Sequence, residues 1–275
     1  MRHLLRRDRE SARSEFLLAP EVPWTEEYVR THAAFVSAIL DNPNLLELFA
    51  LGLPLPPSYG VGFDERVIEY PWLFARRPTG RVLDAGSTLN HLHILDRILP
   101  LVDSLDIVTL APEATFSRRQ VSYVYADLRD LPFESGQYDT IVSLSTLEHV
   151  GMDNARFGAP GPRAEDPNAE RRRVIGELRR VLRPNGRFLG TVPYGRFEDH
   201  GWFQQLDASR LNELLEPFDA QACAVSVYAY DKRGWERSSI RSAAQARYHD
   251  FTVTGQAAKD RAPAARAVAC IAASL

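Results

Sequence analysis

The chain has 275 residues, of which 45% are hydrophobic, 25% charged and 10% aromatic. This is an ordinary globular composition, which excludes a disordered, collagen-like or fibrous chain. The formal net charge of −3 provides no overall field that would attract polyanions, so we expect neither a nucleic-acid partner nor a membrane partner.

Cysteine usage and the N-terminal residues indicate the compartment. Cys223 and Cys270 lie in apolar runs and form no CxxC pattern or Cys/His cluster. The sequence therefore predicts no disulfide framework and no metal site, which fits a reducing environment. The N-terminus is charged, and its first apolar run, residues 16–19, is too short for a signal peptide. We therefore expect a cytoplasmic protein.

Residues 1–79 are predicted to form an N-terminal helical cap. Thr25 is placed to cap a first helix, because apolar residues follow it at helical spacing. Pro43 fits the first turn of a second short helix. Asp64 is placed to cap a third helix, which Pro71 is expected to kink or interrupt.

From residue 80 onward, short apolar strands alternate with helices. Strands are predicted near residues 81–84, 105–110, 121–126, 138–144, 187–192, 220–230 and 265–274. Helices are predicted near residues 91–99, 113–119, 168–183 and 207–216. Alternation at this spacing predicts an open α/β sheet with right-handed crossovers over residues 80–275.

Polar residues follow several of these strands, where an open α/β sheet binds its ligands. Asp84, Gly86 and Ser87 end the first strand, and a glycine there lets the backbone approach a ligand closely. Asp127 follows the third strand and Ser145 follows the fourth. The sequence therefore predicts a ligand site at the carboxyl edge of the sheet.

Four segments in register make the chain resemble a known family. They are residues 81–90, 124–133, 138–150 and 179–188. Over roughly residues 80–195 the chain resembles the class I S-adenosylmethionine-dependent methyltransferases, of the broad group that includes ubiquinone-biosynthesis-type enzymes. The resemblance implies methyl transfer from S-adenosylmethionine. It also implies a Rossmann-like open seven-stranded sheet whose seventh strand, residues 265–274, is antiparallel to the others.

The resemblance also implies which residues bind the cofactor. Its amino acid part is matched by Asp84, Gly86 and Ser87, its adenine by Asp127 and Leu128, and its methionine moiety by the neighbourhood of Ser145. Where the family normally places an acid for the ribose hydroxyls, this chain has Thr109. An uncharged partner binds more weakly than a charged one, so Glu113 stays open as the alternative.

The predicted reaction is O-methylation of a small molecule. For a hydroxyl acceptor, a nearby base contributes about 10²–10⁴-fold in rate. His200, in a polar and aromatic stretch after the fifth strand, is the preferred base, and His149, which follows the fourth strand, is the second candidate. The same stretch favours a sugar, a glycan intermediate or a specialised metabolite as acceptor. The sequence leaves the oligomeric state open.

Alternatives differ in the residues that they require. A metal-dependent methyltransferase is disfavoured, because Ser143 and Ser145 stand where acids are expected after the fourth strand. A nicotinamide oxidoreductase requires a fuller GxGxxG pattern. A non-catalytic binding or scaffold protein of the same fold stays open, because Thr88, Asn90 and Thr109 depart from the family's pattern.

Overall fold

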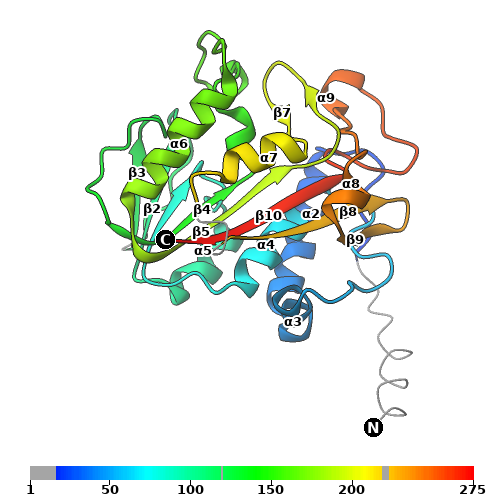
Figure 1. Ribbon diagram of the computed structural model, residues 1–275. Coiled ribbons are helices and arrows are strands. Elements are labelled where there is room, and N and C mark those ends of the chain that lie inside the picture. The colour runs from blue at the N-terminus through cyan, green and yellow to red at the C-terminus, as the bar shows by residue number, and fades with distance from the viewer. Residues whose placement is uncertain (1–16, 119, 219–222) are drawn as a thin grey trace.

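The computed structural model describes residues 17–118, 120–218 and 223–275 (Figure 1). These residues form an eight-stranded sheet in the order β3-β2-β1-β4-β5-β10-β8-β9. Its strands are β1 (Arg81–Ala85), β2 (Ser104–Thr109), β3 (Val121–Tyr125), β4 (Tyr138–Leu144), β5 (Leu182–Pro193), β8 (Cys223–Asp231), β9 (Gly234–Ser238) and β10 (Ala267–Ser274). Strands β1 to β5 are parallel, and β10 is antiparallel to both β5 and β8. The predicted open α/β sheet and its antiparallel strand are therefore confirmed.

The predicted count of seven strands is wrong, because β9 adds an eighth at the edge. It forms a hairpin with β8, and Gly234 at the turn has a φ of +99°, a conformation that glycine adopts without strain. The N-terminal segment holds this strand in place. Trp235 donates from its backbone to the Tyr59 carbonyl and from its indole to the Phe63 carbonyl. These partners are distant in sequence, so the strand pattern alone did not reveal β9.

Helices cover both faces of the sheet (Figure 1). Helices α6 (Pro167–Val181) and α7 (Ala208–Leu215) lie on one face, and α2 (Glu26–Leu40), α3 (Pro43–Leu51), α4 (Arg66–Ala75) and α5 (Leu92–Ile98) lie on the other. Because strand side chains alternate between faces, Val82 packs with the α2–α5 layer and Leu83 with the α6–α7 layer. Short elements complete the fold: η1 (Leu99–Leu101), η2 (Leu147–His149), η3 (Ala155–Phe157), β6 (Glu198–Asp199), β7 (Gln204–Gln205), α8 (Ile240–Ala243) and α9 (Phe251–Thr254).

The predicted helix over residues 113–119 is absent from the described part, residues 113–118. Side chains hold this backbone in an irregular path. The Asn90 amide donates to the Ala114 carbonyl, and the Tyr123 hydroxyl accepts from the Phe116 backbone. Residue 119 itself, residues 220–222 of a predicted strand and residues 1–16 of the predicted cap lie outside the described residues.

Two of the N-terminal helices begin at side-chain caps. The Thr25 hydroxyl accepts from the backbone of Tyr28 to start α2, as predicted, and the Asn42 amide oxygen caps α3. Of the described helices, no single one is long and apolar enough to cross a membrane, although the bent pair α2 and α3, which meet at 80°, passes together by length and composition.

Helix α4 continues through Pro71, so the predicted interruption is wrong. A proline inside a helix removes the donor to the carbonyl four residues earlier, here that of Val67. The Tyr59 hydroxyl donates to this carbonyl instead, at 2.7 Å. The chain thus satisfies the acceptor that Pro71 leaves open.

The buried stripe of α6 should carry much of the stability of its layer. We expect Leu178→Ala to lower the free energy of unfolding by about 2–5 kcal/mol, because Leu178 is 1% exposed within the core. Urea unfolding measures this loss. The matched control is Leu51→Ala, whose side chain is 63% exposed; equal losses in the two variants would contradict the packing described.

Candidate functional site

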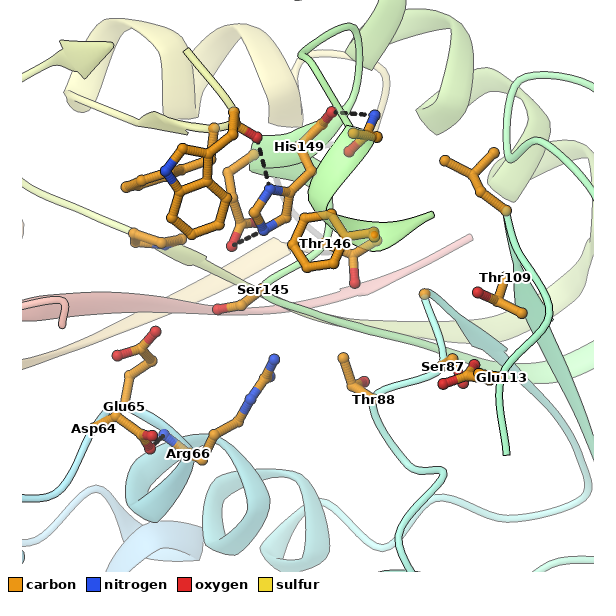
Figure 2. A pocket seen from close by; sticks show the side chains of 18 of the residues that line it. Asp64, Glu65, Arg66, Ser87, Thr88, Thr109, Glu113, Ser145, Thr146 and His149 are labelled. Atoms are coloured by element: carbon orange, nitrogen blue, oxygen red, sulfur yellow. Dashed lines mark hydrogen bonds and ion pairs between the residues drawn. The ribbon is translucent and has the colours of Figure 1, made fainter. Parts of the chain in front are cut away.

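A cavity of about 650 Å³ lies at the carboxyl edge of the parallel strands. Loops that follow β1, β2, β3 and β4 line it, together with the start of α4 and residues 248–252. Figure 2 shows Ser87, Thr109 and Glu113 on one side and Asp64, Glu65 and Arg66 on another. We call the first part, which also includes Gly86, Asp127 and Leu128, the cofactor end. The acidic end comprises Asp64, Glu65, Glu148, His149 and Tyr248.

Asp84 lies beneath the cofactor end and is not among the described residues that line the cavity. Its fully buried carboxylate accepts from the Leu89 backbone at 2.8 Å and from the Thr88 hydroxyl at 3.3 Å. Burial raises its pKa to about 7. Asp84 thus holds the loop that carries Gly86 and Ser87, and its predicted contact with the cofactor stays a prediction.

Gly86 and Ser87 present backbone and hydroxyl to the cavity. Gly86 has a φ of +122°, and a Cβ there would meet the Thr146 side chain, so only glycine fits this close approach. Ser87, at a φ of +61°, is a non-glycine residue in the left-handed region. Its hydroxyl is buried without a hydrogen-bond partner among the described residues. An unpartnered polar atom beside a glycine turn fits a polar ligand group.

Asp127 and Leu128 line the cofactor end together. The carboxylate of Asp127 accepts from the Arg129 side chain and backbone, and Arg129 also binds Glu170. Although partial burial opposes it, hydrogen bonding to Arg129 lowers the pKa of Asp127. A carboxylate fixed in its ionised form is a strong acceptor for an amino group.

Both predicted ribose partners line the cofactor end. The Thr109 hydroxyl donates to the carbonyl of Ala111 at 3.3 Å. Glu113 lies in the irregular segment after β2, close enough to the first loop that its charge raises the pKa of Asp84, after the larger effect of burial. The cavity therefore brings Thr109 and Glu113 to the same end.

Ser145 is held by a buried carboxylate that the sequence did not single out. Its hydroxyl donates to Glu69 of α4 at 2.5 Å, and Glu69 also accepts from the Thr191 hydroxyl. The third partner is Arg66, whose Nη1 donates to Glu69 at 2.6 Å and to the Leu144 carbonyl at 3.3 Å. Figure 2 shows the Arg66 guanidinium projecting into the space between Glu65 and Thr88.

His149 points into the cavity with one ring nitrogen anchored. Its Nδ1 lies 2.9 Å from the Trp202 carbonyl (Figure 2). A carbonyl only accepts, so Nδ1 carries the proton and Nε2 carries the lone pair. Burial lowers the pKa of His149 to about 4, which keeps the ring neutral near pH 7. Trp202 stacks on the ring and Phe157 meets it edge-on.

His200 does not line the cavity, in contrast to its place as the preferred base. The hairpin of β6 and β7 turns its ring against Phe203, with centroids 4.5 Å apart and an interplanar angle of 7°. Phe203 and Tyr248, which do line the cavity, separate His200 from it. His149 is therefore the better-placed base.

Two buried carboxyl groups at the acidic end have oxygens without partners. Glu65 is 9% exposed and Glu148 is 2% exposed, and in each the Oε2 atom has no hydrogen bond among the described residues. Burial raises the pKa of Glu65 to about 8 and that of Glu148 well above its ordinary value. In the described part of the chain, no group of three or more His, Cys, Asp or Glu side chains is arranged to hold a metal ion.

Comparison with known proteins identifies the domain that carries the cofactor end. Residues 85–190 match the family model described as a methyltransferase domain. The chain thus carries a methyltransferase domain, of the S-adenosylmethionine-dependent kind that the sequence resembles. The matched residues carry Gly86, Ser87, Asp127 and His149, and the cofactor end of the methyltransferase fits S-adenosylmethionine because it offers a close-approach glycine, an unpartnered hydroxyl and an ionised carboxylate.

Solved structures similar to this methyltransferase include three at low identity. The 1,6-didemethyltoxoflavin-N1-methyltransferase of Burkholderia thailandensis is 16% identical, with coverage of 93% of this chain and 92% of that one and a TM-score of 0.46. N-methyltransferase NodS of Bradyrhizobium japonicum is 11% identical, with 88% and 97% coverage and a TM-score of 0.44. YcgJ of Bacillus subtilis is 16% identical, with 72% and 92% coverage and a TM-score of 0.42. No curated protein matches the sequence.

His149 gives the methyltransferase a pH-dependent stability. Its folded pKa of about 4 lies below the ordinary 6.5, so the unfolded chain binds the extra proton first as pH falls. The contribution is complete above about pH 6.5 and is lost toward about pH 4, by roughly 3 kcal/mol in all. We expect wild type to lose stability relative to His149→Asn over that window, as measured by urea unfolding. Parallel pH profiles of the two proteins would contradict this.

Proposed function

We propose that this methyltransferase transfers the methyl group to a hydroxyl of a small molecule, of the class of sugars, glycan intermediates and specialised metabolites. The observation that carries the proposal is the fixed tautomer of His149. Its Nδ1–H is held by the Trp202 carbonyl, so the lone pair is on Nε2, which lies 3.8 Å from Glu148 Oε1 in the wall of the cavity. A neutral imidazole in this state is a general base.

The cofactor is proposed to lie along the cofactor end. Gly86 and Ser87 would surround its amino acid part, and Arg66 would bind the carboxylate of that part. Asp127 would accept from the adenine amine, with the Leu128 backbone beside the ring. Thr109 or Glu113 would bind the ribose hydroxyls. Ser145, held by Glu69, supports this placement because it borders both ends of the cavity.

The chain's own residues supply orientation and proton transfer. When bound, S-adenosylmethionine supplies an electrophilic methyl group on its sulfonium, and it leaves as S-adenosylhomocysteine. His149 Nε2 takes the proton of the acceptor hydroxyl as the new oxygen–carbon bond forms. The Trp202 carbonyl stabilises the imidazolium through Nδ1–H. Holding the acceptor in line with the methyl carbon is the main catalytic effect.

The N-terminal helical segment is proposed to act as the cap of this site. Trp24, Tyr28 and His32 line the cavity from α2 and the turn before it. His32 is bound to Asp64 at the start of α4, at 2.9 Å. Aromatic walls on this side exclude water from the reacting groups, which strengthens every electrostatic interaction inside.

Removal of Asp127 tests the cofactor site. We expect Asp127→Ala to weaken S-adenosylhomocysteine binding by about 10–100-fold, the loss of one hydrogen bond to a charged group. Isothermal titration measures this, with S-adenosylmethionine titrated in parallel. Asp130→Ala, an exposed neighbour that does not line the cavity, is the matched control. Unchanged affinity in Asp127→Ala would place the adenine elsewhere.

Exchange of the two histidines tests the base. Once screening has identified an acceptor, we expect His149→Gln to lower kcat by about 10²–10⁴-fold with little change in S-adenosylmethionine affinity. His200→Gln, behind Phe203, should keep most of the activity. Radiolabelled methyl transfer, with cofactor affinity measured by calorimetry, separates these effects. Loss of activity in His200→Gln alone would return the base to that residue.

A further inference from the structure

We infer that the acceptor carries a protonated amine, which Glu65 and Glu148 hold at the acidic end of the cavity. The acceptor is thus an amino alcohol in the broad sense: one group anchors it and its hydroxyl receives the methyl group. This inference rests on the proposed function, because that function supplies the hydroxyl and the base. The acidic end itself supplies the argument for the amine.

The carboxyl groups at and beside the acidic end differ in whether they have an ion-pair partner. Asp64 is paired with His32, and Glu69 with Arg66. Neither Glu65 nor Glu148 forms such an ion pair with Arg66, although the charge of Arg66 lowers the pKa of both against the larger effect of burial. Glu148 lies 3.8 Å from the Nε2 of His149, a ring that burial keeps neutral. The described cations nearest the acidic end are therefore paired with Asp64 and Glu69, and Glu65 and Glu148 have no cation of their own.

Arg171 is the next cation and does not change this balance. Its charge and that of Glu148 influence each other, but the two groups form no ion pair. The Nη2 of Arg171 instead donates to the side chains of Gln204 and Asn168. Its Nη1 is buried without a hydrogen-bond partner among the described residues, but Arg171 does not line the cavity, so this donor does not serve a ligand there.

The carboxyl groups of Glu65 and Glu148 border the cavity. Both Glu65 and Glu148 line the cavity, and each has a buried Oε2 with no partner in the described part of the chain. A buried acceptor left unpaired costs about 1–3 kcal/mol, and the cost is larger for a charge. An ammonium group, with three donors and a positive charge, removes this cost for both residues at once.

Three separate elements of the fold contribute side chains to the acidic end. Glu65 comes from the start of α4, Glu148 from η2 after β4, and Tyr248 from the segment after α8. All three line the same cavity, and the charges of Glu65 and Glu148 add to the larger effect of burial in raising the pKa of Tyr248. An aromatic ring beside two carboxyl groups is a favourable site for an organic cation. Figure 2 shows Glu65 and His149 on opposite sides of Ser145, so an anchored amine lies within the same cavity as the base.

A pair of small probes tests the inference without knowledge of the acceptor. Benzylamine is a cation at neutral pH, and benzyl alcohol has nearly the same shape without charge. We expect the S-adenosylhomocysteine-saturated protein to bind benzylamine at least about tenfold more tightly than benzyl alcohol, a difference of 1.4 kcal/mol. Ligand-observed NMR titration gives both affinities.

Variants then assign the preference to the two carboxyl groups. In Glu65→Gln, and in Glu148→Gln, we expect the ratio of the two affinities to fall toward one. The matched control is Glu47→Gln on the surface of α3, which should keep the wild-type ratio. Retained binding of S-adenosylhomocysteine reports that each variant is folded.

Three results of the probe titrations would contradict an amine-bearing acceptor. Equal affinities in wild type, failure of both probes to bind at millimolar concentration, or a preference that survives in both glutamate variants overturns the inference. Two other results would overturn the proposed function: wild type that binds neither S-adenosylmethionine nor S-adenosylhomocysteine, or a His149→Gln variant that keeps full activity. Neither result depends on the amine probe.

Discussion

The buried carboxylate of Glu69 connects the parts of the molecule on which the site depends. It accepts hydrogen bonds from Ser145 after β4, from Thr191 on β5 and from Arg66 one turn earlier in α4. A fully buried carboxylate without partners would be strongly unfavourable, so these contacts fix each other's positions. Tyr70, the next residue, donates to the carbonyl of Thr88 in the first loop. One helix thus sets the spacing between the loops that surround the cavity.

This arrangement explains why the cavity has two chemically different ends. The cofactor end is built by the edge of the sheet, whose loops present glycine, hydroxyl and carboxylate groups at short sequence intervals. The acidic end is built where α4 approaches η2 and the segment after α8. Its groups come from distant parts of the chain. Burial raises the pKa of Glu65 and lowers that of His149, so each favours its neutral form until a charged ligand group binds beside it.

The sequence predicted what local patterning controls. The alternation of strands and helices and the Thr25 cap follow from residues close together in the chain, and Gly86 was recognisable because a tight turn requires it. The departures arose from distant partners. Tyr59 satisfies the carbonyl that Pro71 leaves open, and the Tyr59 and Phe63 carbonyls hold the eighth strand.

The same reasoning separates the two histidines. Both occur in polar stretches that follow strands, and sequence alone favoured His200 for its aromatic surroundings. Those aromatic residues proved to be its packing partners: Phe203 lies flat against the ring and faces the cavity in its place. Glu65 and Glu148 left no sequence signal, because an uncompensated carboxylate is recognisable only once its neighbours are placed.

The contacts of the N-terminal helices with the β8–β9 hairpin have a consequence for synthesis on the ribosome. Phe63 and the Trp235 indole that binds its carbonyl are 172 residues apart. At about 5–20 residues per second, the first helices wait on the order of ten to thirty seconds for this partner. Helix α4 meets its partners in the first loop, Thr88, and in β5, Thr191, well before that. The N-terminal segment therefore completes its contacts in two stages, first with the parallel strands and last with the β8–β9 hairpin.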